Sequence, residues 1–171
     1  GLVLTIGDNP KYGDPLGIKY WERTENARDF LKNEIKIRNT KLGCLLSPRP
    51  VKKERYSQAF TITDMINRIK TGWDFALFMR LTDQTFPILE DLSKEMKKLN
   101  VPLYTYVLVG TPRNAETLKQ IGWEPTTTIN NVVSYVEKLD GMVDGTIVTC
   151  AGDYQGDLEV LKLLNGKFRK R

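Results

Sequence analysis

Five apolar runs alternate with segments of helical periodicity along this chain, and the alternation constrains the fold more than any other feature. The runs are short and most are bounded by Gly, Pro or Asn; they cover residues 2–6, 41–46, 73–79, 101–109 and 145–150. Apolar residues recur at helical spacing in 25–37, 61–71, a helix beginning at 82–85, 114–121, 128–139 and 157–164. Strand–helix alternation of this kind predicts a parallel sheet covered by helices.

Two architectures fit five βα units within a single α/β domain spanning residues 1–171. One is a (β/α)8 barrel of the TIM type, of which this chain holds the last five units. The other is a complete, open, five-stranded sheet of the flavodoxin type. We favour the barrel, because the first strand begins one residue after Gly1 and a chain seldom opens inside a core strand. An N-terminal remainder or a partner chain would then complete the barrel.

Composition excludes several kinds of site. The chain has no histidine, which removes Ser-His and Cys-His chemistry and most zinc sites, so we expect no metal. Cys44 and Cys150 have no CxxC spacing and are expected to be buried free thiols in a cytoplasmic protein. No apolar run approaches the roughly 20 residues that cross a bilayer. The net charge of +5 without interleaved aromatic residues argues against a nucleic-acid partner.

Small or polar residues follow each apolar run, at the strand ends where α/β proteins bind ligands. They are Gly7-Asp8, Ser47-Pro48-Arg49, Met79-Arg80, Gly110-Thr111 and Cys150-Ala151-Gly152-Asp153. Arg49, Arg80 and Arg113 could clamp a phosphate or a carboxylate. The alternative is that loop residues are polar anyway, and that Gly7-Asp8 forms a plain turn. Trp73 and Trp123 are interpreted as packing residues.

The first of these segments resembles a motif of a known enzyme family. Leu4-Thr5-Ile6-Gly7-Asp8-Asn9-Pro10 is similar to the Leu-Arg-Gly-Asp-x-Pro element of methylenetetrahydrofolate reductases. Further segments resemble that family in the same order: Leu42-Gly43-Cys44 to Pro48, Ile66 to Phe75, Asp83 to Phe86, Val101-Pro102-Leu103 and Val143-Asp144-Gly145.

The resemblance implies a flavin-containing barrel and a flavin-dependent reductase of one-carbon metabolism. NAD(P)H would reduce bound FAD, which would then reduce a methylene-folate or related pterin. Asp8 would assist the chemistry, and Gly7, Ser47, Arg49 and Arg68 would hold the cofactor. Met79, Arg80, Thr111 and Asp153 would face the substrate.

The chain also departs from the family pattern. Ile6, Ser47 and Met79 stand where the family has arginine, tyrosine and a folate-contacting glutamine. Methionine cannot offer a pterin the paired hydrogen bonds of a glutamine. The alternative function is therefore a degenerate barrel that binds a pterin or a partner without flavin. Five barrel units alone would expose strand edges and an apolar interior, which predicts an oligomer.

Overall fold

The computed structural model describes residues 1–4, 22–37, 39–48 and 61–168. The strands are β1 (Leu2–Leu4), β2 (Leu42–Leu46), β3 (Phe75–Phe78), β4 (Leu103–Gly110), β5 (Thr127–Thr128) and β6 (Gly145–Thr149). The helices are α1 (Glu22–Asn33), α2 (Ile62–Lys70), α3 (Phe86–Leu99), α4 (Ala115–Ile121), the 3-10 turn η2 (Ile129–Asn131), α5 (Val132–Leu139) and α6 (Tyr154–Phe168). The predicted α/β class is confirmed.

Local sequence signals set several of these boundaries. Thr61 and Asp64 form a reciprocal capping box at the start of α2. Pro87 lies in the first turn of α3, where its missing N–H costs no hydrogen bond. Asn100 ends α3 in the left-handed conformation, with φ of 54°.

Every pairing in the sheet is parallel, and the strands follow one another in chain order. The order is β1-β2-β3-β4, with β6 on the far side of β4. It differs from the 2-1-3-4-5 order of flavodoxin-type sheets. The two-residue strand β5, absent from our prediction, pairs with Val109 and Gly110 at the end of β4. A strand this short leaves no periodic signal in the sequence.

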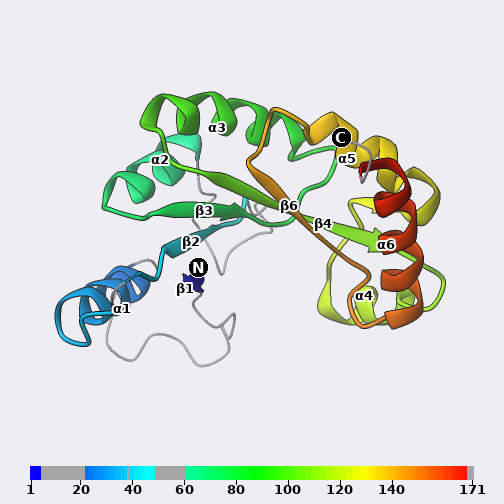
Figure 1. Ribbon diagram of the computed structural model, residues 1–171, viewed down its shortest axis with the longest axis horizontal. Helices are drawn as coiled ribbons and strands as arrows, with labels where there is room; N and C mark the ends of the chain where they lie inside the picture. Colours follow the sequence, from blue (N-terminus) through cyan, green and yellow to red (C-terminus); the bar gives the residue numbers. More distant parts are fainter. Residues whose placement is uncertain (5–21, 38, 49–60, 169–171) are drawn as a thin grey trace, which may run out of the picture.

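One face of the curved sheet carries the helices, and its side chains form the core (Figure 1). Side chains alternate between the two faces along a strand. The residues of the helix-covered face are almost completely buried in β2, β3 and β4: Leu42, Cys44, Leu46, Ala76, Phe78, Leu103, Thr105, Val107 and Val109. Met65, Leu89, Leu92 and Val132 pack against them from the helices.

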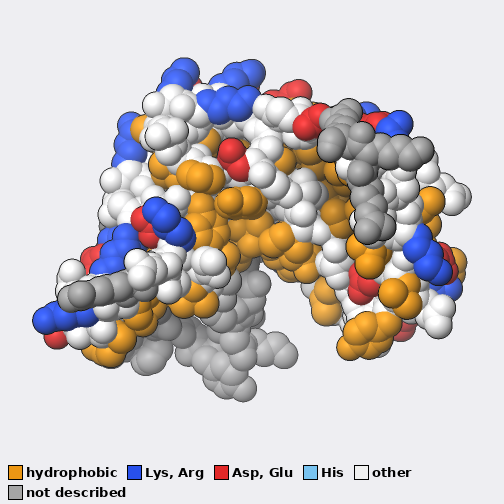
Figure 2. Space-filling view, in the orientation of Figure 1, with side chains coloured by type: hydrophobic (Ala, Val, Ile, Leu, Met, Phe, Trp, Pro, Cys, Tyr) orange, Lys and Arg blue, Asp and Glu red, His pale blue; other side chains and the backbone are white. Residues whose placement is uncertain are grey.

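The opposite face, which we call the inner face, is apolar but only partly buried. The strand register assigns to it Val3, Gly43, Leu45, Phe75, Leu77, Tyr104, Tyr106, Leu108, Gly145, Ile147 and Thr149. Most of these side chains are partly accessible, and Ile147 is 45% exposed. Figure 2 shows a hollow on the underside of the molecule with hydrophobic side chains gathered on it. No described helix covers this face.

Glycines on the inner face make room for aromatic rings that lie across the sheet. A Cβ on Gly43 would lie 2.2 Å from Cε2 of Phe75, and one on Gly145 would lie 2.9 Å from Cδ1 of Tyr104. The two rings meet edge to face, with centroids 5.6 Å apart. Aromatic rings therefore form the surface of the amino-terminal part of the inner face.

Helix α1 packs differently from the prediction. We expected Ala27, Phe30, Leu31 and Ile35 to form its buried stripe, but Phe30 and Ile35 are more than half exposed. The buried positions are Thr24 and Arg28. Arg28 lies over the ring of the buried Trp73 and donates to the Thr71 hydroxyl. Of the predicted stripe, Leu31 packs partly buried against the core. Arg28 adds polar contacts with the α2–β3 connection, which hydropathy periodicity cannot predict.

Among the described residues, no helix combines the length and the apolar character needed to cross a membrane.

Candidate functional site

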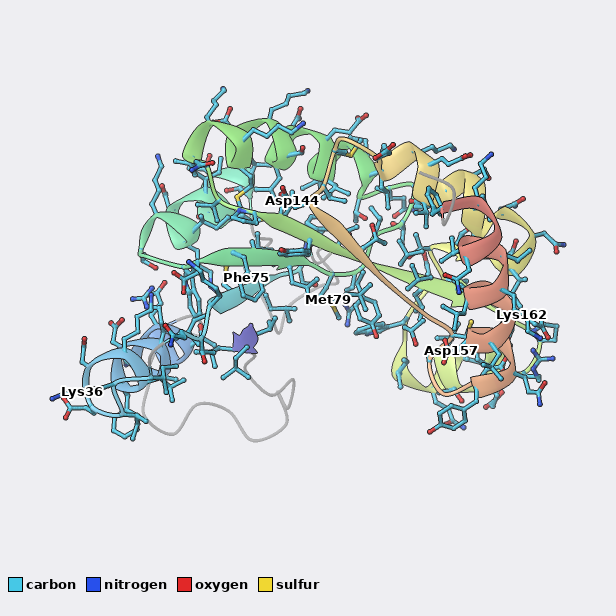
Figure 3. All side chains as sticks on the ribbon, viewed as in Figure 1. Lys36, Phe75, Met79, Asp144, Asp157 and Lys162 are labelled. Atoms are coloured by element: carbon cyan, nitrogen blue, oxygen red, sulfur yellow. The ribbon has the colours of Figure 1, made fainter. Side chains whose placement is uncertain are left out.

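The predicted site residues that follow described strands lie at one edge of the sheet, which we call the carboxyl edge, whereas Arg68 lies in α2. Parallel strands end at the same edge. Ser47 therefore follows β2, Met79 and Arg80 follow β3, and Thr111 follows β4. Figure 3 places Met79 just beyond the end of β3. Gly7, Asp8 and Arg49 lie outside the residues that the structure describes.

Thr111 and Asp153, which come from different strand ends, are brought into direct contact. The Thr111 hydroxyl donates to Oδ2 of Asp153 at 2.7 Å. Nε of Arg113 donates to both carboxylate oxygens of Asp153 at 2.9 Å. Oδ1 of Asp153 also accepts from the backbone N–H of Gly156 in the first turn of α6. The carboxylate of Asp153 therefore caps α6 and ties it to the β4–α4 loop.

The neighbours of Asp153 keep it ionised. The hydrogen bond from Arg113 is the largest cause that lowers the pKa of the carboxyl to about 2, and the bonds from Gly156 and Thr111 act in the same direction. The side chain of Asp153 is only 4% exposed. A substrate that bound Asp153 would have to displace one of these donors.

Asn114 completes this cluster, and the sequence analysis did not single it out. Its Oδ1 accepts from the Thr111 N–H, and its Nδ2 donates to the carbonyls of Val109 and Cys150. The side chain therefore joins the ends of β4 and β6. An Asn four residues after a strand end, immediately before a helix, is the only sequence signal that could have indicated this role.

Arg80 takes a conformation unusual for a residue with a side chain, with φ of 59°. Its guanidinium carbon lies 5.4 Å from the centre of the Trp123 ring. Trp123 also meets Tyr106 of the inner face edge to face. Arg80 and Trp123 therefore form a contact beyond the ends of β3 and β4, and Trp123 does more than fill the core.

Ser47 and Arg68 differ in their capacity to hold a cofactor. The Ser47 hydroxyl is buried and has no hydrogen-bond partner among the described residues, so it fits a polar atom of a ligand. Arg68 donates from Nη1 to the Leu45 carbonyl and from Nη2 to the Thr24 hydroxyl. A cofactor phosphate at Arg68 would have to replace these bonds, so Arg68 does not fit the phosphate-binding role in this arrangement.

A cleft of about 700 Å³ opens beside the β4–α4 loop. Its walls come from the residues around α4, the α4–β5 connection, η2 and α6: Gly110, Thr111, Pro112, Asn114, Ala115, Leu118, Lys119, Trp123, Glu124, Pro125, Thr128, Ile129, Asn130 and Glu159. Gly110 permits close approach here, because a Cβ on it would lie 2.9 Å from Cβ of Pro125. This volume is in the usual range for small-molecule sites.

The thiols and carboxylates do not form a recognisable reactive centre in the part of the chain described. Burial raises the pKa values of both the Cys44 and the Cys150 thiols to about 12, which leaves them protonated and unreactive. Those described residues contain no group of three or more His, Cys, Asp or Glu side chains that could hold a metal ion.

No protein-family model matches this chain, and a search of curated proteins finds no similar sequence.

Proposed function

We propose that this chain supplies consecutive βα units of a (β/α)8 barrel in a cytoplasmic protein. The chain-order parallel strands and the helices on one face support this architecture. So does the inner face, because a parallel sheet that is apolar on both faces needs cover on both. A further segment of the protein, or a partner chain, would supply the remaining strands and bury the inner face.

We further propose a flavin-dependent reductase of the methylenetetrahydrofolate reductase type. The observation that carries this proposal is the buried, unpartnered hydroxyl of Ser47 at the carboxyl edge, beside an apolar inner face on which a flat ring system can lie. When bound, FAD would accept hydride from NAD(P)H and pass it to a methylene-folate or related pterin.

The roles of the chain's own residues follow from their places at the strand ends. Ser47 would donate a hydrogen bond to the flavin, and Met79 and Arg80 would line the adjoining substrate space. Gly7, Asp8 and Arg49 keep the roles that the sequence resemblance implies, with Asp8 as the residue that assists the chemistry.

A second candidate function has an observation of its own. Arg68, Thr111 and Asp153 already form side-chain hydrogen bonds within the chain, so a flavin or its substrate would have to displace them. These features favour a barrel that binds a pterin or another protein without using flavin.

The test is an absorption spectrum of the protein in the assembly in which it occurs naturally, followed by titration with FAD. The reductase proposal predicts stoichiometric flavin that bleaches with NAD(P)H. Ser47→Ala should weaken flavin affinity by about threefold to tenfold, the worth of one hydrogen bond. Ser134→Ala, an exposed hydroxyl on α5, is the matched control. A protein that neither carries nor takes up flavin would refute the reductase and leave the flavin-free barrel.

A further inference from the structure

The cleft beside α4 has an apolar floor. Leu118 is 4% exposed, and Trp123, Pro112, Pro125 and Ile129 contribute further apolar surface. The Trp123 ring is the largest flat surface among them. The body of a ligand that fits this cleft is therefore hydrophobic, and an aromatic ring would find a partner of its own kind.

Two charged side chains of opposite sign stand at the same cleft without ion-pair partners. Lys119, in the last turn of α4, and Glu124, after the helix, both line it. Neither forms a salt bridge with any of the residues described. The third charged residue of the lining, Glu159, is already bonded to Arg113 at 3.3 Å. The cleft therefore offers one available cation and one available anion.

From this combination we infer that the cleft binds a free α-amino acid with an aromatic side chain. The ligand's carboxylate would pair with Lys119, its ammonium group with Glu124, and its ring would lie on the apolar floor around Trp123. Glu124 and Glu159 would repel a purely anionic ligand, and Lys119 would repel a purely cationic one. A zwitterion avoids both repulsions. The cleft adjoins the carboxyl edge through Thr111 and the Arg80–Trp123 contact, whereas the proposed hydrogen bond to flavin comes from Ser47 after β2.

The experiment is a titration of the full chain with L-phenylalanine, followed by the 15N–1H signal of the Trp123 indole, which Trp123→Phe identifies. Two analogues test the charges: phenethylamine lacks the carboxylate, and 3-phenylpropionate lacks the ammonium group. Each exposed ion pair contributes up to about 1 kcal/mol, so each analogue should bind about threefold to fivefold more weakly than phenylalanine.

Variants separate the two charges. Lys119→Gln should weaken binding of phenylalanine but not of phenethylamine, which loses a repelling cation and should bind equally well or better. Glu124→Gln should weaken binding of phenylalanine but not of 3-phenylpropionate, which loses a repelling carboxylate. Lys162→Gln on α6, outside the cleft, is the control and should change nothing. All three positions are exposed, so these variants should fold normally.

Three results would each overturn the inference. One is no saturable shift of the Trp123 signal up to roughly 10 mM phenylalanine. Another is equal binding of phenylalanine and both analogues. The last is a Lys119→Gln or Glu124→Gln variant that behaves like the control. Loss of flavin binding in the assembly would leave this inference untouched, because the flavin titration probes the Ser47 side of the carboxyl edge.

Discussion

The side chain of Asn114 joins two strand ends, so its removal should be among the most destabilising single changes in the described structure. Asn114 is 1% exposed and makes three side-chain hydrogen bonds: from the N–H of Thr111 at 2.8 Å, and to the carbonyls of Val109 at 2.8 Å and Cys150 at 2.6 Å. Asn114→Ala removes all three and leaves buried backbone groups without partners. With about 1 kcal/mol for each bond and a further penalty for the orphaned groups, the loss is roughly 3–4 kcal/mol.

A loss of this size is a large fraction of the roughly 5–15 kcal/mol that stabilises an ordinary domain. Urea unfolding followed by circular dichroism would measure it as a fall in midpoint at constant slope. Asn114→Asp should be at least as harmful at neutral pH. It keeps the acceptor for Thr111 but directs a carboxylate oxygen at the two carbonyls that the amide now bonds.

The matched control is Asn67→Ala at an exposed position inside α2, where the change should stay within about 0.5 kcal/mol. If Asn114→Ala costs less than about 1 kcal/mol relative to this control, the bonds to Val109 and Cys150 do not hold β4 and β6 together. The reasoning that places Asn114 at the centre of the carboxyl edge would then be refuted.

Three further predictions concern other parts of the fold. The pKa of Asp153 is lowered to about 2, so its contribution to stability is complete above pH 4 and is lost as the pH falls towards 2. Asp153→Asn should flatten this acid limb of the stability curve, and an unchanged limb would contradict the role of Asp153. Gly43→Ala should destabilise by about 1–3 kcal/mol because its methyl group overlaps the Phe75 ring, and the penalty should vanish in a Phe75→Ala background, as a double-mutant cycle in urea would show. Tyr135→Phe removes a buried hydroxyl that has no partner among the described residues, and should leave the thermal midpoint equal or higher.

The order of elements was predictable because each strand and helix carries its own period. Strands β1, β2, β3 and β6 fall within the predicted runs, and β4 extends one residue beyond its run, to Gly110. Thr61 precedes α2, Pro87 lies in the first turn of α3 and Asn100 follows its last residue. The apolar runs also predicted that the strand residues would be buried. It could not tell the helix-covered face from the inner face, because a parallel sheet that is buried on both sides reads as apolar at every position.

The composition of the carboxyl edge was predictable, but its connections were not. Thr111 and Asp153 were predicted only as substrate-facing residues after two strands, and the structure brings them within hydrogen-bond distance of each other. The donors that occupy Asp153 lie in the next helix and in the β4–α4 loop, and only three-dimensional packing reveals them. Arg68 shows the same limit, since the family resemblance implied a cofactor contact while its partners here are a carbonyl in β2 and a hydroxyl in α1.

The α4–β5 connection covers part of the inner face and so limits where a ligand of the proposed barrel would lie. Tyr106 and Gly110 belong to the inner face, and they touch Trp123 and Pro125 respectively. The chain therefore covers the carboxyl end of its own inner face, whereas the surface of the amino-terminal part includes the rings of Phe75 and Tyr104. Additional barrel strands would have to fill mainly this amino-terminal and middle part. A ligand at the carboxyl edge would instead contact Trp123 and Pro125 of the α4–β5 connection. This short segment, which has no strand or helix signal in the sequence, therefore helps to form the opening of the proposed barrel.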